Sequence, residues 1–336
     1  MDIKETNSHF WAKDGTMYGV GVDIGATYTR VVLADEKGNF IDRISEATIK
    51  TGDGLSLTYQ IIRMIEQILE RNDIKCQDLM GIGIGSIGPL DIKRGVIINP
   101  PNLPFKEVPL SEPLNKAFNV EVKVFNDCTA AVVGERIFGA GKGLDNVVYI
   151  TISTGIGGGA YVDGHLLIGK DGNAVEIGHM VVDPQGLRKC GCGKRGHWEA
   201  YCSGANIPKY ARILLNERDN LEKSLIYEYV RGNLEDLTAK MIYDAAKRDD
   251  RLALEIIEKV NIFNAIGVAN VINIYDPELI TLGGSVVLNN IDLVVKPIKD
   301  MIKEYAMNRI PEIKVTPLAG DVVLYGAVAL SLGLAP

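Results

Sequence analysis

Two histidines and two cysteines lie close together near the middle of the sequence. The chain has only four histidines and five cysteines, and the strings EIGH and CGCGKRGHWE bring two of each within 19 positions. Imidazole nitrogens and thiolate sulfurs at short spacing around glycines are donors that tetrahedral zinc takes, and four protein ligands make a closed, structural site. The sequence therefore predicts a structural Zn²⁺ site formed by His179, Cys190, Cys192 and His197. Two alternatives stay open, namely Cys202 as the fourth ligand and a glycine loop without metal.

Two glycine-rich strings could bind phosphate. DIGATYT supplies a turn with one carboxylate and two hydroxyls, from Asp23, Thr27 and Thr29, and STGIGGG is a second glycine turn between predicted strands. Backbone N–H groups in such turns point the same way and form a concavity that binds anions. Asp23 could hold Mg²⁺ directly or through water. Either string alone is typical of a plain hairpin turn, but two strings in a repeated context favour phosphate binding.

Two further features have a simple structural interpretation. Gly83 to Gly88 fits the pattern GxGxxG, but Pro89 and Asp91 follow where a nucleotide-binding helix would begin. We therefore interpret it as a tight turn after a strand. Asp127 lies in FNDC between a predicted strand and a predicted helix, where a side chain can face a cleft. From this position alone, Asn126 or Asp127 caps the helix, and a cap is the simplest interpretation of Asp127.

The elements that position these loops follow from hydrophobic patterning. From Tyr18 the runs YGVGVD, RVVLAD and FIDRISE predict a strand meander, and NVVYITIS, AYVDG and HLLIGK repeat it from Asn146. Two copies indicate two related halves, each presenting a glycine hairpin to a shared cleft. Helical spacing predicts helices in LTYQIIRMIEQILERND, over Leu252–Ile274 and in GDVVLYGAVALSLG. Alternating strands and helices place the chain in the α/β class.

Length and composition set further limits. A chain of 336 residues favours two domains, and no charged or Pro-rich linker separates them. The net charge is −7 with no basic stripe, which argues against a nucleic-acid partner. No apolar run is long enough to span a membrane, and the initial string MDIKETNSHFWAK lacks the apolar core of a signal peptide. An odd number of cysteines in a long chain favours a reducing cytoplasm.

Together and in this order, the motifs resemble the ROK family of sugar kinases and repressors, within the actin-like ATPase fold. DIGATYTR resembles the family's first phosphate motif, with Ala26 where glycine is commoner, STGIGGG the second, and LGGS the loop over adenosine. The resemblance implies a two-domain, ribonuclease H-like α/β fold with the active site in the interdomain cleft. The smaller domain would comprise residues 18–127 and 320–336, and the larger one residues 128–319. The ATP-binding residues that it implies are Asp23, Gly25, Ala26, Thr27, Thr154, Gly155, Gly157, Gly158, Gly283, Gly284 and Ser285.

The resemblance also implies an activity: transfer of the γ-phosphoryl group of MgATP to the 6-hydroxyl of a hexose. Asp127 would be the catalytic base rather than only a helix cap. In the zinc site the family usually has one histidine and three cysteines, with cysteine where this chain has His197. The sugar-binding residues that it implies are Asn102, Asn126, Asp127, Glu176, His179 and Glu199.

Substrate and assembly are less sharply defined. Glucose is the expected sugar, with N-acetylmannosamine, N-acetylglucosamine, allose and fructose as alternatives, and the glycine loops do not exclude polyphosphate or ADP as donor. The resemblance implies a homodimer or homotetramer. Repressors of the family carry an N-terminal DNA-binding domain, and only 22 residues precede Asp23, too few for a helix-turn-helix domain. We therefore expect an enzyme that binds a sugar and MgATP.

Overall fold

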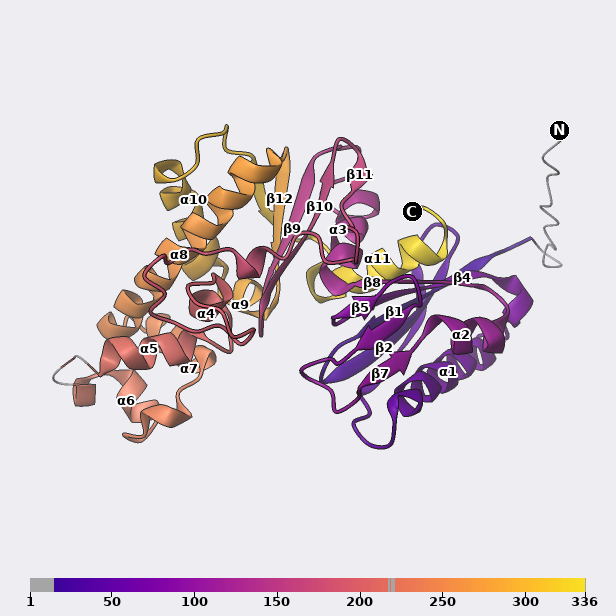
Figure 1. Ribbon diagram of the computed structural model, residues 1–336, viewed down its shortest axis with the longest axis horizontal. Coiled ribbons are helices and arrows are strands. Elements are labelled where there is room, and N and C mark those ends of the chain that lie inside the picture. Colours follow the sequence, from indigo (N-terminus) through magenta and orange to yellow (C-terminus); the bar gives the residue numbers. More distant parts are fainter. Residues whose placement is uncertain (1–14, 217, 219–220, 336) are drawn as a thin grey trace. The chain divides into compact units, whose positions relative to one another are not determined.

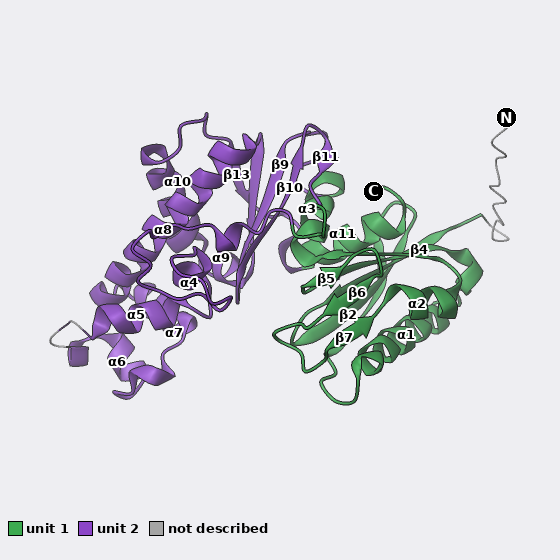
Figure 2. Cartoon of the chain, viewed as in Figure 1, with its two compact units in different colours: residues 1–138, 169–173, 321–336 green, residues 139–168, 174–320 purple. Residues whose placement is uncertain are grey.

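The computed structural model describes residues 15–216, 218 and 221–335, which divide into two compact units (Figure 2). Unit 1 takes its described residues from the ranges 1–138, 169–173 and 321–336, and unit 2 from 139–168 and 174–320. The string MDIKETNSHFWAK, in which the sequence predicts no signal peptide, lies outside the described residues. In the described part of the chain, no helix is both long and apolar enough to cross a membrane.

Unit 1 is built on a five-stranded sheet in the order β3-β2-β1-β4-β8 (Figure 1). The predicted meander is confirmed, because the first three strands pair in antiparallel register along the chain. The fourth and fifth strands run parallel to the first. The strands are β1 (Tyr18–Ile24), β2 (Tyr28–Asp35), β3 (Phe40–Ala47), β4 (Leu79–Ser86) and β8 (Glu121–Asn126).

The glycines of GIGIGSIG lie mostly inside β4, so the interpretation of Gly83 to Gly88 as a turn is only partly right. Helix α11 (Val322–Ser331) crosses this strand so closely that a Cβ atom on Gly83 would lie 1.9 Å from the Ala327 carbonyl oxygen. Glycine is needed there for packing between helix and sheet, and the turn itself occupies only the residues after Ser86.

The remaining helices of unit 1 follow the predicted pattern. Helix α1 (Gly54–Arg71) buries the apolar face that the spacing of Leu57, Ile61, Met64 and Ile68 predicts. A small antiparallel sheet lies between α1 and α2 in the sequence. Its strands and the other helices are β5 (Leu90–Asp91), β6 (Val96–Ile98), β7 (Glu107–Pro109), α2 (Ser111–Phe118) and α3 (Asp127–Ile137).

Helix α3 belongs to unit 1, whereas the sequence assigns residues from 128 onward to the larger domain. The reason is its packing against α11. A Cβ atom on Gly326 of α11 would lie 1.7 Å from the Ala130 carbonyl oxygen of α3, so the two backbones are in direct contact. The division between the units therefore follows α3, near Phe138, rather than Asp127.

Unit 2 repeats the strand order of unit 1. Its sheet has the order β11-β10-β9-β12-β13, with two antiparallel pairs followed by two parallel pairs, as in unit 1. The prediction of two related halves is thus confirmed, although the third strand of the second meander is only two residues long. The strands are β9 (Val147–Ile152), β10 (Ile156–Val162), β11 (His165–Leu166), β12 (Leu279–Gly283) and β13 (Glu312–Val315).

The helices of unit 2 surround one long core helix, α8 (Arg251–Tyr275), which matches the run predicted over Leu252–Ile274. Trp198 is fully buried against α8 and donates a hydrogen bond of 2.9 Å from its indole nitrogen to Oδ1 of Asn264. This contact fixes the chain between His197 and Glu199. The other helices are α4 (Glu199–Cys202), α5 (Ile207–Leu215), α6 (Leu225–Tyr229), α7 (Ala239–Ala246), α9 (Ser285–Leu288) and α10 (Ile291–Met301).

Candidate active site

In unit 1 the predicted phosphate loop and the predicted base lie at one edge of the sheet. The parallel register pairs Ile24 with Ser86, and Ser86 with Asn126, so β1, β4 and β8 end side by side. The loop of Gly25 to Thr27 follows the first of these strand ends, and Asp127 follows the last. The carboxyl edge of parallel strands is where α/β proteins commonly bind ligands. The sheet therefore groups these residues although about 100 positions separate them in the sequence.

The first phosphate loop is a tight turn whose backbone is held by hydrogen bonds to Tyr28 and Thr48. The Gly25 N–H donates to the Tyr28 carbonyl at 3.0 Å, and the Gly25 carbonyl accepts a 2.7 Å hydrogen bond from the Thr48 hydroxyl. Thr48 in turn shares a hydrogen bond with Thr29, whose hydroxyl is buried. The expectation that Thr29 offers a hydroxyl to phosphate is therefore wrong, because this hydroxyl supports the turn from below. Thr27 is exposed, and its hydroxyl remains a candidate.

Asp23 lies at the end of β1 with its side chain almost buried. Burial raises the pKa of its carboxyl group above the ordinary value, although the neighbouring Arg30 opposes this shift through its charge and hydrogen bonds. Arg30 Nε donates to Asp23 Oδ2 at 2.9 Å, and a second guanidinium nitrogen contacts the same oxygen. Sequence reasoning missed Arg30. The signal was its place on the second strand of the hairpin, directly opposite Asp23.

Asn126 and Asp127 lie where β8 passes into α3. The Asn126 side chain is the N-cap, with its Oδ1 accepting the Cys128 N–H at 2.9 Å. Asp127 is the first helical residue, half-buried, and its Oδ1 accepts the same N–H at 2.8 Å. Asp127 is thus not the cap. Asn102 is exposed in the loop between β6 and β7.

In unit 2 the second glycine turn lies beside the LGGS loop. Residues 153–155 form the turn between β9 and β10, and Thr154 at its tip is exposed. Gly283 pairs with Thr151 across the sheet, and the hydroxyls of Ser153 and Ser285 are 3.1 Å apart. Gly284 has a φ of 87°, and a Cβ atom there would lie 2.4 Å from the Ile152 carbonyl oxygen, so only glycine fits.

The structure places two of the predicted phosphate-binding glycines differently from the others. Gly157 and Gly158 belong to β10 rather than to the turn. Gly158 is buried, and a Cβ atom there would lie 2.6 Å from the end of the Ile177 side chain. A side chain at position 158 would have to displace Ile177, while Thr154 and Gly155 lie in the turn.

Glu176, His179 and Glu199, three predicted sugar-binding residues, gather in unit 2. His179 Nε2 lies 3.9 Å from a carboxylate oxygen of Glu176. Removal of water by the surrounding protein raises the pKa of Glu176, His179 lowers it, and the charge of Glu199 adds to the increase. Glu199 Oε2 accepts the Ile156 N–H at 2.9 Å, so this carboxylate also supports the start of β10.

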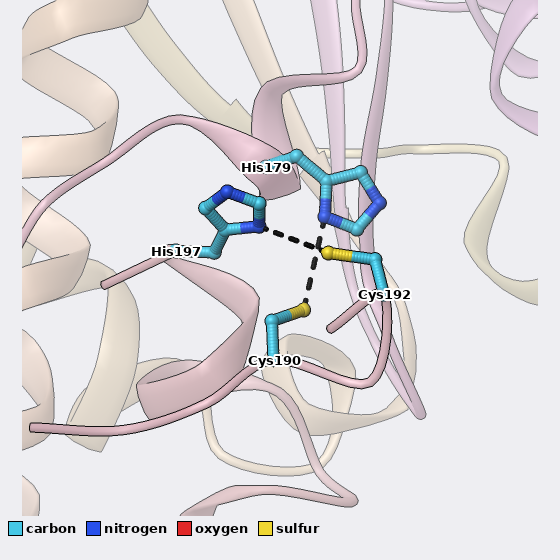
Figure 3. A group of neighbouring side chains, drawn as sticks. All are labelled: His179, Cys190, Cys192 and His197. Carbon is cyan, nitrogen blue, oxygen red and sulfur yellow. Dashed lines mark hydrogen bonds between the residues drawn. The ribbon is translucent and has the colours of Figure 1, made fainter. Parts of the chain in front are cut away.

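The four predicted metal ligands converge in unit 2 (Figure 3). One ligand atom from each of His179, Cys190, Cys192 and His197 lies within 4.8 Å of all the others. Cys190 Sγ is 3.8 Å from His179 Nδ1, and Cys192 Sγ is 3.3 Å from His197 Nδ1. The alternative ligand Cys202 is buried elsewhere, with its Sγ 3.2 Å from the Val260 carbonyl oxygen. The donor set and its spacing fit a tetrahedral zinc ion.

The protonation state of this cluster depends on whether a cation is bound. Burial raises the pKa of Cys190 to about 11 and lowers the pKa of His197. Without a cation, Cys190 would therefore be a neutral thiol and His197 a neutral imidazole near pH 7. A bound divalent cation reverses the preference at the sulfur atoms, because its charge stabilises the thiolate.

The loop that carries the cluster is held by a separate polar network. The Tyr201 hydroxyl donates to Asp183 and accepts the Arg188 N–H at 2.8 Å. Asp183 also accepts the N–H groups of Gln185 and Leu187 at 3.0 and 2.9 Å. Burial acts to raise the pKa of Asp183, but these hydrogen bonds outweigh it, and the pKa is lowered from its ordinary value of 3.8.

We expect Asp183→Asn to lower the free energy of unfolding by about 1–2 kcal/mol near neutral pH, because it weakens hydrogen bonds to a charged group. A carboxylate with a lowered folded-state pKa stabilises the protein above about pH 3.8, and this contribution is lost as the pH falls through the folded-state value. Urea unfolding at several pH values measures the difference from the unmodified protein, which should shrink below pH 3.8. Asp244→Asn, at an exposed Lys240 pair, is the control and should change stability by less than about 0.5 kcal/mol. An equal effect at all pH values would contradict the role of Asp183.

Comparison with known proteins decides the family. The model of the ROK family matches residues 19–331. The chain belongs to the ROK family. Among curated relatives, a glucokinase of Pyrobaculum calidifontis is 40% identical over 312 residues, covering 93% of this chain and 94% of the relative. A glucokinase of Thermotoga maritima is 35% identical over 315 residues, covering 93% and 96%.

A solved ROK structure shows the same architecture. The ROK family glucokinase from Streptomyces griseus, determined in complex with glucose and AMPPNP, has a TM-score of 0.75 and 31% identity, covering 94% of this chain and 99% of that one. The chain therefore has the two-domain actin-like ATPase fold that the motifs predicted, and its two five-stranded sheets are the repeated cores of that fold.

Proposed function

We propose that this ROK protein is an ATP-dependent kinase that transfers the γ-phosphoryl group of ATP to the 6-hydroxyl of glucose. The observation that carries the proposal is the shared sheet edge in unit 1, where the register of β1, β4 and β8 groups the first phosphate loop with Asp127. The glucokinases at 40% and 35% identity support glucose as the acceptor.

Asp127 is assigned as the general base. As the sugar 6-oxygen attacks the γ-phosphorus, its proton passes to the Asp127 carboxylate, the bond to the β–γ bridging oxygen breaks, and ADP leaves. The reaction needs little covalent chemistry from the protein, so alignment and charge neutralisation dominate. Mg²⁺, when bound with ATP, neutralises phosphate charge, and Asp23 is the side chain of unit 1 that would hold it directly or through water. The carboxylate donor of Asp23 fits this hard cation.

The sugar-binding and nucleotide-binding roles are assigned to the residues described for each unit. In unit 1 we assign Asn102 and Asn126 to sugar hydroxyls, and in unit 2 Glu176, His179 and Glu199. Phosphate and adenosine contacts are assigned to the two glycine turns and the LGGS loop; those residues are Gly25, Ala26, Thr27, Thr154, Gly155, Gly283, Gly284 and Ser285. Gly157 and Gly158 lie in β10 and are not assigned a phosphate contact.

We further propose a structural zinc ion at His179, Cys190, Cys192 and His197. The convergence of four soft and borderline donors within 4.8 Å supports it. With all four positions filled by protein, such an ion would take no part in the chemistry and would fix the loop between His179 and Glu199. None of the five cysteines, all of which lie in the described residues, forms a disulfide bond, which agrees with a reducing cytoplasm. We also propose that the protein forms a homodimer or homotetramer. Light scattering, which measures the mass of the assembly in solution, tests this oligomeric state.

The experiment that tests the acceptor is a coupled ADP-release assay with MgATP and five sugars. We expect kcat/KM to be highest for glucose among glucose, fructose, allose, N-acetylglucosamine and N-acetylmannosamine. A higher kcat/KM for an N-acetylhexosamine would change the assigned substrate but would still support the assignment as a sugar kinase. Absence of ADP release with every sugar would contradict the kinase itself.

A further inference from the structure

Arg30 contacts two carboxylates, those of Asp23 and Asp321, with its three guanidinium nitrogens. It lies on β2 directly opposite Asp23 on β1. Two of its guanidinium nitrogens contact a single oxygen of Asp23, Oδ2, with Nε at 2.9 Å. The side chains are only 28% and 13% exposed, so the pair is largely shielded from water. Among the described residues, Asp23 Oδ1 accepts no hydrogen bond from another side chain.

The third guanidinium nitrogen connects this pair to the start of α11. Arg30 Nη1 donates to Asp321 Oδ1 at 3.0 Å, and Asp321 directly precedes that helix. The other oxygen of Asp321 accepts a 3.3 Å hydrogen bond from Arg43. The four side chains form a row of alternating charge, Asp23, Arg30, Asp321 and Arg43, entirely within unit 1.

This geometry leaves one oxygen of Asp23 available. A carboxylate bound at one oxygen by a planar guanidinium is fixed in orientation, and its second oxygen can serve a cation or a cation-bound water. Groups that hydrogen-bond a metal-binding carboxylate orient it and tune its basicity. A lysine at this position would supply charge but could not bridge two carboxylates with the same fixed geometry.

We propose that Arg30 is a positioning residue for the magnesium-nucleotide complex: it holds Asp23 by Oδ2, keeps Oδ1 available to Mg²⁺, and is itself held by Asp321. This inference rests on the proposed kinase function, because it assigns Asp23 to the nucleotide's cation. In this proposal Arg30 acts through Asp23 and not on the reacting atoms themselves. Its effect should therefore appear in the dependence on Mg²⁺ rather than in the affinity for sugar.

The test is calorimetric titration with AMPPNP, in excess Mg²⁺ and in chelator, for the unmodified protein and its variants. The unmodified protein should bind AMPPNP more tightly with Mg²⁺. We expect Arg30→Met to remove most of this gain while leaving the affinity in chelator within about twofold, and Arg30→Lys to keep part of it. In the ADP-release assay, the Mg²⁺ concentration for half-maximal rate should rise about 10-fold or more for Arg30→Met, the range expected for removal of an outer-shell partner.

Arg43→Met is the matched control. Arg43 contacts the same Asp321 but not Asp23, and its side chain is 67% exposed. This variant should keep the Mg²⁺-dependent gain. Asp321→Asn should weaken the gain less than Arg30→Met does, and should add nothing in the Arg30→Met background, because it acts through Arg30.

Two results separate failure of this inference from failure of the proposed function. An unmodified protein that does not bind AMPPNP with Mg²⁺ would contradict the kinase assignment and the role of Arg30 together. A normal gain in both the unmodified protein and Arg30→Met would overturn the role of Arg30 alone. If Arg30→Met does not fold, Arg30→Lys decides, and an unchanged Mg²⁺ dependence in that variant overturns the inference.

Discussion

Asp127→Asn is expected to lower kcat for glucose phosphorylation by about 10²- to 10⁴-fold, the range that a general base contributes. The amide is nearly the same size as the carboxylate but cannot accept the proton of the 6-hydroxyl. Glucose affinity, measured by calorimetry, should stay within a few-fold, because Asn126 and the other assigned contacts are unchanged. Asp127 is the first residue of α3, and the N-cap is Asn126, so the helix should keep its cap.

Asp53→Asn is the matched control for this variant. Asp53 is the N-cap of α1 and accepts the Ser56 N–H at 3.2 Å. Its replacement tests what a helix-end aspartate contributes without a catalytic role, and we expect full turnover with a small loss of stability. An Asp127→Asn enzyme with kcat close to that of the control would show that Asp127 is not the base.

Loss of the metal cluster should have the largest effect on stability. We expect one zinc ion per chain by metal analysis, and loss of this ion in Cys190→Ser. Removal of a metal belongs to the few changes that cost more than about 4 kcal/mol. In a unit of this size that loss lowers the melting temperature by roughly 8–16 °C. Activity should fall in parallel, since the cluster holds the chain between His179 and Glu199.

Cys202→Ser distinguishes the cluster from the remaining cysteine in this region. Its thiol faces the Val260 carbonyl in a buried position, and a serine hydroxyl can keep that hydrogen bond. We expect Cys202→Ser to retain zinc. Well under one zinc per chain in the unmodified protein would contradict the site, and zinc loss in Cys202→Ser but not in His197→Ala would favour the alternative ligand set.

Much of the fold could be predicted because its signals are local. The two meanders and the helices α1 and α8 follow from hydrophobic spacing, and their repetition indicated two halves. The short strands β6 and β7 were not predicted, since Val96–Ile98 and Glu107–Pro109 are too brief to show alternation. The assignment of α3 to unit 1 depends on packing against α11, which lies almost 200 residues later in the sequence.

Glycine was the least reliable guide to the site. Gly83 and Gly158 look like loop residues in the sequence, yet they lie in strands where a helix or an isoleucine approaches closely. A glycine in a ligand-binding loop and a glycine in a closely packed strand both leave room for a neighbouring group. The residue type alone therefore cannot distinguish the two environments. The grouping of His179, Cys190, Cys192 and His197 was easier to predict, because histidine and cysteine are scarce in this chain and four of them at short spacing match the donor set of zinc. Arg30 and Asp183 were missed because their roles arise from partners across a hairpin or a helix.

The central claim, that this ROK protein phosphorylates glucose at the 6-hydroxyl, is tested most directly by identifying the product. The purified protein is incubated with MgATP and glucose, and the sugar product is analysed by NMR together with the ADP formed. We predict glucose 6-phosphate and ADP in equal amounts, with neither formed when glucose is omitted. ADP without a phosphorylated sugar, or a phosphate on another hydroxyl of glucose, would contradict the claim.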